Sequence, residues 1–299
     1  MANLKAIRKR ISTVKSTQKI TRAMKMVSGA RLNRAQQRIV ALRPYAQQVS
    51  DMLGEVVRAI GANNLEDPHA LLARREEKRV LFLVISGDRG LCGAFNANVN
   101  KRAEALWKAK VAEGVEVKFA TIGRRARDYF RRRSAPFFKD FEGVWEDLNL
   151  AQARRIARAL LAPFLSGEVD AIYLIYNEFK SAMTQQVISR TLLPLAEAVP
   201  ALKSEAASDV EPSPEYIFEP NQASLFETLV PMYIEITLLR ALYDSVAAEL
   251  GARMTAMDSA TKNASEMIST LTLRYNRQRQ AVITTELIEI IAGSEALQS

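Results

Sequence analysis

Apolar residues recur at spacings of three and four along the first part of the chain, which is the period that places side chains on one face of an α-helix. The run passes through Leu4, Ile7, Ile11 and Val14, shifts phase to Ile20, Met24 and Val27, and resumes at Leu32, Ala35, Ile39 and Leu42. Pro44 is expected to kink or locally break this helix. The period returns after the proline, so the pattern predicts that the helix continues to about Val57.

The last third of the chain carries a longer pattern of the same kind. The spacing between successive residues alternates between four and three in two runs. The first run is Met232, Ile236, Leu239, Tyr243, Val246 and Leu250. After a one-residue slip the second is Met254, Met257, Thr261, Ala264, Ile268, Leu271, Tyr275, Gln278, Val282 and Thr285. Heptads sustained over this length predict a coiled coil. The small and polar members of the series indicate an irregular seam between the helices.

The pattern changes between these two helices. Short β-branched runs occupy residues 80–85, 116–122 and 171–176, a further strand is expected within 185–193, and helical patterns cover 98–110 and 150–165. Strands that alternate with helices predict an α/β domain with a largely parallel sheet. The chain is therefore expected to consist of an N-terminal coiled-coil helix (1–60), a central α/β domain (78–202) and a C-terminal coiled-coil helix (221–295), with an exposed linker at 204–220 that is rich in Ser, Glu and Pro.

Helix lengths predict how the two terminal helices pair. At about 1.5 Å per residue the first is about 80 Å long and the last about 100 Å, so neither fits inside a globular domain. Both join the same central domain, and the simplest arrangement is a long antiparallel coiled coil. The N-terminus is then reached opposite about residues 275–280, which leaves an apolar tip without a partner in the chain. This tip contains Val282, Ile283, Leu287, Ile288, Ile290 and Ile291.

Composition excludes several classes of protein. Hydrophobic residues make up 48% of the 299 residues and charged residues 25%, as in soluble globular proteins. Cys92 is the only cysteine and His69 the only histidine, which excludes a disulfide scaffold and gives no basis for a histidine triad or a zinc site. No apolar run approaches the roughly 20 residues that span a bilayer. We therefore expect no catalytic residues, no metal and no cofactor.

Charge is distributed unevenly along the chain. Residues 1–50 hold twelve Lys or Arg and no Asp or Glu, whereas the remaining residues hold thirty basic against thirty-three acidic side chains. The first helix is thus expected to bind an acidic partner, which could be a protein surface, nucleic acid or anionic lipid. Nucleic acid is less favoured, because the first 44 residues contain no aromatic side chain that could stack on bases. A coiled-coil adaptor that binds nucleic acid through this helix remains the alternative. A cleaved presequence is disfavoured, because the basic pattern continues into the heptads.

One glycine-rich loop, residues 86–96, follows the first predicted strand and leads into a helix. Its glycines are spaced by three and depart from the GxGxxG pattern of dinucleotide sites. Asp88, Arg89, Gly90, Cys92 and Gly93 are its candidate functional residues. A structural turn that exposes Asp88 and Arg89 is favoured over a nucleotide-binding enzyme, although the enzyme interpretation stays open.

Three separated motifs resemble the gamma subunit of the F-type ATP synthase, in that family's order and spacing. They are TQKITRAMKMV at 17–27, SGDRGLCGAFN at 86–96 and YNRQRQAVITTELIEIIAG at 275–293. The resemblance implies a central α/β (Rossmann-like) domain and a rotor shaft inside a ring of alternating alpha and beta subunits. It further implies that the domain sits with epsilon on a ring of c subunits, that one copy is present per complex, and that proton flow turns the shaft. The chain is then expected at the cytoplasmic face of the bacterial inner membrane, held there only through the complex.

The resemblance also implies roles for individual residues. Contacts with a beta-subunit loop fall on Arg279, Gln280 and Thr284, and Met24 corresponds to a methionine near an acidic beta loop. Introducing a positive charge at Met24 is expected to create an ion pair there and add drag. The tip residues Ile283, Leu287, Ile288 and Ile291 correspond to the apolar bearing at the top of the ring. Gly87 departs from the Ser or Thr that is usual in the family, and residues 124–148 match no pattern of it.

Overall fold

The computed structural model describes residues 2–62, 71, 75–195 and 222–298, and it forms two compact units. The sheet unit comprises residues 31–252, and the paired-helix unit combines residues 1–30 with residues 253–299. Helix α1 (Ala2–Ala62) and helix α7 (Gln222–Gln298) each contribute to both units. The predicted linker at 204–220 and His69 lie outside the described residues. The division into segments 1–60, 78–202 and 221–295 stays a prediction.

The sheet unit is built on five strands. They are β1 (Arg79–Ile85), β2 (Glu116–Ile122), β3 (Phe137–Phe141), β4 (Ala171–Phe179) and β5 (Gln185–Leu193). Their order across the sheet is β3-β2-β1-β4-β5, and only β5 runs antiparallel to its neighbour. The first four strands in this order, 3-2-1-4, match the order of doubly wound nucleotide-binding folds. The expected largely parallel sheet is confirmed.

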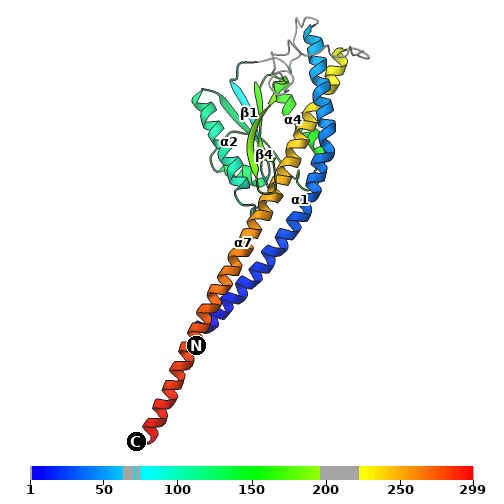
Figure 1. Cartoon of the computed structure of the whole chain (residues 1–299). Helices are drawn as coiled ribbons and strands as arrows, with labels where there is room; N and C mark the ends of the chain where they lie inside the picture. The colour runs from blue at the N-terminus through cyan, green and yellow to red at the C-terminus, as the bar shows by residue number, and fades with distance from the viewer. Residues whose placement is uncertain (1, 63–70, 72–74, 196–221, 299) are drawn as a thin grey trace, which may run out of the picture. The chain divides into compact units, whose positions relative to one another are not determined.

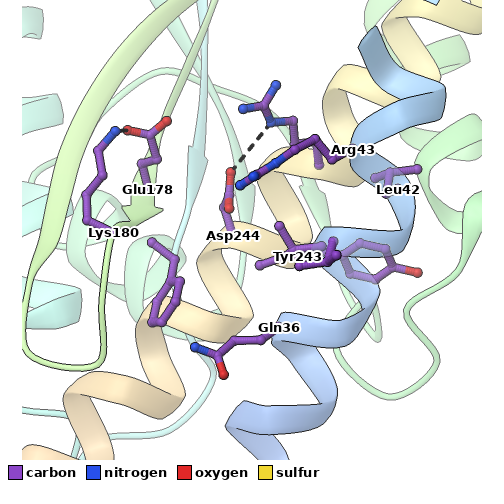
Figure 2. A pocket seen from close by; sticks show the side chains of 11 residues that line it. Gln36, Leu42, Arg43, Glu178, Lys180, Tyr243 and Asp244 are labelled. Atoms are coloured by element: carbon purple, nitrogen blue, oxygen red, sulfur yellow. Dashed lines mark ion pairs between the residues drawn. The ribbon is translucent and has the colours of Figure 1, made fainter. Parts of the chain in front are cut away.

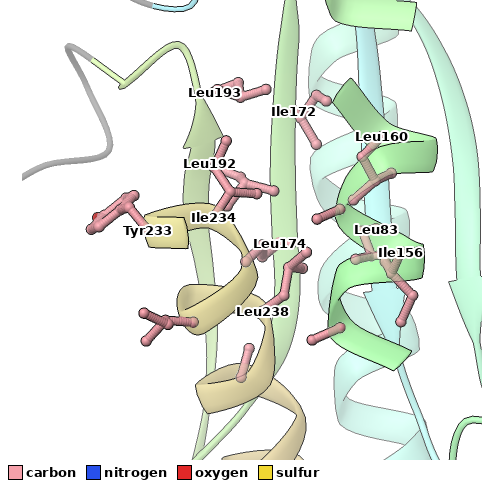
Figure 3. Packing of buried hydrophobic residues seen from close by; sticks show 14 of the residues in the cluster. Leu83, Ile156, Leu160, Ile172, Leu174, Leu192, Leu193, Tyr233, Ile234 and Leu238 are labelled. Atoms are coloured by element: carbon pink, nitrogen blue, oxygen red, sulfur yellow. The ribbon is translucent and has the colours of Figure 1, made fainter. Parts of the chain in front are cut away.

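Both faces of the sheet are covered, as the continuous apolar run at residues 80–85 of β1 requires. Val80, Phe82 and Val84 pack on one face beneath α2 (Phe95–Ala112) and α3 (Arg124–Arg131). Leu81, Leu83 and Ile85 point to the other face, where α4 (Leu150–Leu165) and the parts of α1 and α7 in this unit close the core. Figure 3 shows Ile234 and Leu238 of α7 beside β4 and β5, and Ile156 and Leu160 of α4 over β1 and β4. The long helices are therefore part of the core of the sheet unit.

Helix α3 and strand β3 were not predicted. In α3 only Ala126 and Phe130 are buried among four arginines, so the segment lacks the broad apolar stripe that marks a helix in sequence. Strand β3 is five residues long and lies at the sheet edge, where side chains need not alternate. The predicted strands at 80–85, 116–122, 171–176 and 185–193 and the predicted helices at 98–110 and 150–165 are confirmed to within a few residues.

The two helices of the paired-helix unit are antiparallel, as expected. The hydroxyls of Thr21 and Thr261 lie 2.8 Å apart. Four residues later in α1 and three residues earlier in α7, the Lys25 ammonium donates to the Asp258 carboxylate at 2.5 Å. Extending this register from Thr21 to Leu4 leads to about residue 278 of α7. The rest of α7 therefore continues without α1 beside it (Figure 1). Of its apolar tip side chains, Val282 is half-buried and the others, Ile283, Leu287, Ile288, Ile290 and Ile291, are exposed.

The predicted phase shift in α1 is wrong. Ile20 and Val27 are 60% and 52% exposed, and the buried seam keeps its alternation of threes and fours through Gln18, Thr21 and Ser28. Polar residues fit this seam because Thr21 finds a hydrogen-bond partner in Thr261 and Ser28 is small. The α7 side of the seam runs from Met254 to Val282 as predicted, whereas Thr285 is exposed.

Pro44 does not interrupt α1, which is continuous to Ala62 and so extends beyond the predicted end at Val57. The proline is exposed on the helix surface. The predicted break there is wrong. A proline removes one backbone hydrogen bond, and packing of the following turns through Val49, Leu53 and Val56 compensates for that loss.

Gly123, at the end of β2, provides a test of the sheet unit. Its φ is +95°, and a Cβ placed there would lie 2.1 Å from the Ser86 carbonyl oxygen. We expect Gly123→Ala to lower the free energy of unfolding by about 3 kcal/mol or more, because backbone strain and a clash with main chain add together. Gly114→Ala is the matched control, since its φ is +81° but a Cβ there meets nothing within 4 Å. Urea unfolding of both variants measures the difference, and equal losses would contradict this account.

Candidate functional site

The glycine loop is a tightly bonded turn at the carboxyl end of β1. The buried Ser86 hydroxyl accepts a hydrogen bond from the Ala126 amide at 2.8 Å, and the Gly87 amide donates to Asn96 Oδ1 at 2.9 Å. Asn96 Nδ2 donates in turn to the Arg89 carbonyl oxygen at 3.1 Å. The polar groups of the loop are thus used to hold its own backbone.

Asp88 and Arg89 differ in their surroundings. The Asp88 carboxylate accepts a hydrogen bond from the Arg124 amide at 2.9 Å, so it satisfies one of the unpaired amides at the start of α3. Arg89 is exposed, as are Leu91 and Gly93, whereas Gly90 is half-buried. The expectation that the turn presents both Asp88 and Arg89 is therefore right for Arg89 only.

Cys92 is a packing residue. It is buried in one apolar cluster with Phe95 and with Ala248 and Ala252 of α7, and Phe179 at the end of β4 packs against that cluster. Open sheets of this type bind nucleotides in the crevice at the carboxyl ends of the central strands, where the strand order reverses. Here that crevice, between the ends of β1 and β4, is filled by α7. This packing gives no support to the nucleotide-binding interpretation of the loop. The small residues of α7 within 247–252 are the feature of the sequence that could have predicted this close packing of the helix on the loop.

The predicted contact residues lie on the surface of the paired-helix unit. Arg279, Gln280 and Thr284 are exposed on α7, and the Thr284 hydroxyl donates to the Gln280 carbonyl oxygen at 2.9 Å, one turn earlier. Ile283, Leu287, Ile288 and Ile291 are exposed beyond them. Met24 is half-buried beside the seam of α1 and faces α7 about twenty residues before Arg279. The structure therefore presents two separate candidate contact surfaces.

None of the helices in the described ranges carries an apolar stretch that could cross a membrane. Within the same ranges, His, Cys, Asp and Glu side chains form no group of three that could hold a metal ion.

Comparison with known proteins decides the family. The family model described as ATP synthase matches residues 3–297. An ATP synthase gamma chain from Sorangium cellulosum is 53% identical over the full length of both chains, and one from Geotalea uraniireducens is 47% identical, again over both full lengths. The chain belongs to the ATP synthase gamma-chain family. It is thus a non-catalytic subunit, a gamma chain of the ATP synthase complex.

Solved structures agree on the fold of this gamma chain. A chain of the Euglena gracilis mitochondrial ATP synthase, in the structure of OSCP, F1 and the c-ring, matches with a TM-score of 0.67 and 18% identity, covering 99% of this chain and 95% of the other. A chain of the central stalk and c-ring of the Tetrahymena thermophila enzyme matches with a TM-score of 0.58 and 22% identity, over 81% and 99% of the two chains. The expected fold of long paired terminal helices with a central α/β domain is confirmed.

A groove in the sheet unit of the gamma chain surrounds a carboxylate that sequence reasoning missed (Figure 2). Its volume is about 540 Å³. The lining side chains come from α1, the end of β4 and α7, and they are Gln36, Ile39, Val40, Leu42, Arg43, Glu178, Phe179, Lys180, Arg240, Tyr243 and Asp244. The sequence feature that could have predicted this buried carboxylate is Asp244 itself, an aspartate that lies between apolar positions of the last helix.

Asp244 is the buried charge of this groove. Its side chain is 7% exposed, and its carboxylate lies 4.0 Å from the Arg240 guanidinium. Lys180 is engaged with Glu178 at 2.6 Å. Burial raises the pKa of Asp244 from its ordinary 3.8 to about 6, although the nearby Arg240, Arg190 and Arg43 oppose that shift. The folded chain therefore holds a proton on Asp244 more tightly than the unfolded chain does.

We expect Asp244→Asn to stabilise the chain at pH 8 by on the order of 1–3 kcal/mol. Because the folded pKa is raised, the ionised carboxylate destabilises the fold increasingly as pH rises from about 4 to about 6, and the full penalty persists above that range. The neutral amide avoids it, so the gain should shrink towards pH 4. Thermal unfolding between pH 4 and pH 8 measures this, with the exposed Asp51 changed to Asn as control. A gain that does not depend on pH would contradict the assignment.

Proposed function

We propose that the chain transmits rotation between a proton-driven c-ring and the catalytic beta subunits, so that turning of the shaft drives ATP synthesis and, in reverse, ATP hydrolysis. The observation that carries this proposal is the full-length identity to ATP synthase gamma chains. The arrangement of α1 and α7 supports it, since both enter the core of the sheet unit and both supply the paired-helix unit.

The proposed partners are the alpha and beta subunits in a ring of three each, the epsilon subunit and the c-ring, with one copy of the chain per complex. The proposed location is the cytoplasmic face of the bacterial inner membrane. Several of the most similar relatives come from bacteria, and the helices of the described ranges carry no membrane-crossing stretch. Attachment to the membrane would then depend on the partners. We propose no nucleic-acid role, because acidic loops of a beta subunit, the proposed partner, would account for the basic helix.

The mechanism that we propose depends on the different charges of the α1 and α7 sides of the paired-helix unit. The α1 side of the paired-helix unit carries basic residues without acidic ones, whereas Asp258 and Glu266 lie on α7. A partner that meets different faces of such a shaft experiences a different field at each angle. Contacts that favour one conformation of a beta subunit shift its population, and they shift it by no more than their difference in affinity between the conformations. Rotation would therefore change the affinity of each beta subunit for nucleotide in turn.

Arg279, Gln280 and Thr284 are the residues proposed to engage a loop of a beta subunit. Arg279 and Gln280 are exposed on α7 opposite the first residues of α1, and Thr284 is exposed just beyond the end of α1. The Arg279 guanidinium can make charge-assisted hydrogen bonds to carboxylates, and the Gln280 amide can add a neutral one. Thr284 already donates its hydroxyl hydrogen within the helix, so it is left to act as an acceptor.

The proposed bearing and the Met24 contact complete the assignment. Ile283, Leu287, Ile288 and Ile291 present an apolar surface that water disfavours, and an apolar sleeve at the top of the ring would cover it. Met24 lies next to Lys25, whose ammonium is held by Asp258. A cation introduced at Met24 would therefore face partner carboxylates with less local neutralisation than Lys25 has.

Arg279→Ala tests the proposed contact. Because Arg279 is exposed, the isolated chain should unfold as the unaltered chain does, whereas ATP synthesis and hydrolysis by the assembled complex should fall by roughly tenfold, as for loss of one charged hydrogen bond. Arg274→Ala is the control, since Arg274 is also exposed on α7 and lies on the other side of the seam from Arg279. Unchanged activity in Arg279→Ala, or equal losses in both variants, would count against this role.

Affinity purification of the tagged chain from gently solubilised membranes tests the proposed function as a whole. Recovery of an ATPase together with alpha, beta and epsilon subunits is the expected result. Recovery of the chain alone, or with nucleic acid, would overturn it.

A further inference from the structure

The groove around Asp244 has the size and the composition of a site for a small molecule. Its volume of about 540 Å³ falls within the range of about 300–1,000 Å³ that is usual for such sites. Its lining residues come from α1, from α7 and from the end of β4, and all of them belong to the sheet unit. The groove is therefore formed within one compact unit of a single chain.

Two guanidinium groups of the groove have donors to spare. Arg43 is exposed on α1, and Figure 2 shows its side chain extending toward Asp244. Among the described residues no carboxylate lies within ion-pair distance of Arg43, whereas Lys180 is paired with Glu178 at 2.6 Å. Arg240 lies 4.0 Å from Asp244, which is beyond hydrogen-bond distance. The N–H groups of Arg43 and Arg240 are therefore available to an anion that enters the groove.

Asp244 supplies a buried acceptor to the groove. Only 7% of its side chain is exposed, and within the described part of the chain no donor lies at hydrogen-bond distance from its carboxylate. A buried carboxylate with so little compensation destabilises the fold, and such groups are concentrated at functional sites. A ligand hydroxyl or amino group that donates to Asp244 would relieve this cost.

Apolar side chains form the rest of the lining. Ile39, Val40 and Leu42 come from α1, and Phe179 and Tyr243 add two aromatic rings. Val40 is 63% exposed, so the fold leaves part of this wall uncovered. Walls of this kind bury the flat or aliphatic part of a ligand, while the few polar groups among them fix its orientation.

We propose that the groove binds a nucleoside phosphate, with Arg43 and Arg240 holding its phosphate groups and Asp244 accepting hydrogen bonds from its hydroxyl or amino groups. Guanidinium groups match phosphate oxygens in bidentate geometry. A bare anion would leave Asp244 and the apolar wall unused, and a purely apolar ligand would leave both arginines unused, so a ligand that joins the two chemistries is favoured.

This site differs from the crevice between the ends of β1 and β4, which α7 fills. It goes beyond the transmission of rotation and does not depend on it, because the groove lies within a single chain.

Isothermal titration calorimetry of the full-length chain with ADP, inorganic pyrophosphate and adenosine tests this site. Pyrophosphate carries the charge alone, and adenosine carries the base and the hydroxyls alone. We expect ADP to bind roughly tenfold more tightly than either, because it makes both sets of contacts. Irradiation of the chain with 2-azido-ADP, followed by mass spectrometry, should place the adduct among the lining residues at 36–43, 178–180 or 240–244.

Variants of the groove should act in opposite directions. Arg43→Gln should weaken ADP binding about tenfold, as for loss of one charge-assisted hydrogen bond. Arg38→Gln is the matched control, since Arg38 is exposed on the same helix within the sheet unit and does not line the groove. Asp244→Asn should strengthen pyrophosphate binding roughly threefold, because it removes a repelling charge. It should also reduce the preference for ADP over pyrophosphate, because an amide oxygen accepts more weakly than a carboxylate.

The proposal is overturned if ADP does not bind with a Kd below about 1 mM, or if pyrophosphate or adenosine binds as tightly as ADP. It is also overturned if the adduct lies outside the lining residues, or if Arg43→Gln and Arg38→Gln weaken binding equally. Each of these results would refute the ligand site alone, whereas absence of companion subunits in the affinity purification would refute the proposed function.

Discussion

The contact between α7 and the carboxyl edge of the sheet organises the sheet unit. Ala248 and Ala252 pack on Cys92 and Phe95, and Gly251 lets the Ala182 carbonyl approach the helix closely. Larger side chains at these positions would push the helix off the loops, since buried surfaces are packed without spare volume. The crevice that holds a nucleotide in folds of this strand order holds a helix here. A sheet with the strand order of nucleotide-binding folds thus packs against a helix at that position, so function has to be argued from the site and not from the fold.

The two long helices are bound very differently in the two units. In the sheet unit, α1 contributes Leu53 and Val56 to a large apolar core, and α7 contributes Ile234, Leu238 and their neighbours. In the paired-helix unit the seam is narrow, and Gln18, Thr21 and Ser28 occupy positions where a strong coiled coil has leucine or isoleucine. Burial of apolar area contributes about 25 cal/mol per Å², so the grip on the helices is concentrated in the sheet unit. A shaft built this way is held firmly at one unit and pairs loosely in the other.

Sequence patterns predicted those elements whose side chains have one environment throughout. The strand at 80–85 is buried along its length, the strand at 116–122 is buried at every position except Glu116 and Lys118, and the α7 seam repeats over many turns, so these elements were found. The α1 seam was misread because Ile20 and Val27 are apolar yet exposed, while the true seam positions are polar. The position of the glycine loop after a strand was enough to predict that it forms a structural turn. The sequence did not predict that α7 fills the crevice beside the loop, because the α7 residues that do so lie about 150 positions further along the chain. Asp244 was missed for the same reason, since its partners Arg43 and Glu178 come from other elements.

Weak, exposed charge suits a surface that must release its partner. In the paired-helix unit Asp258 engages Lys25 and Lys262, and most of the other basic side chains of α1 face solvent. An exposed ion pair contributes about 0.2–1 kcal/mol and acts over a distance of about 10 Å, so many such charges attract an acidic partner without fixing its position. A buried apolar contact of the same total strength would fix one orientation. The exposed charges of α1 therefore allow attraction with continuous exchange of contacts, and the few directional groups on α7, Arg279 and Gln280 among them, are left to distinguish one orientation from the next.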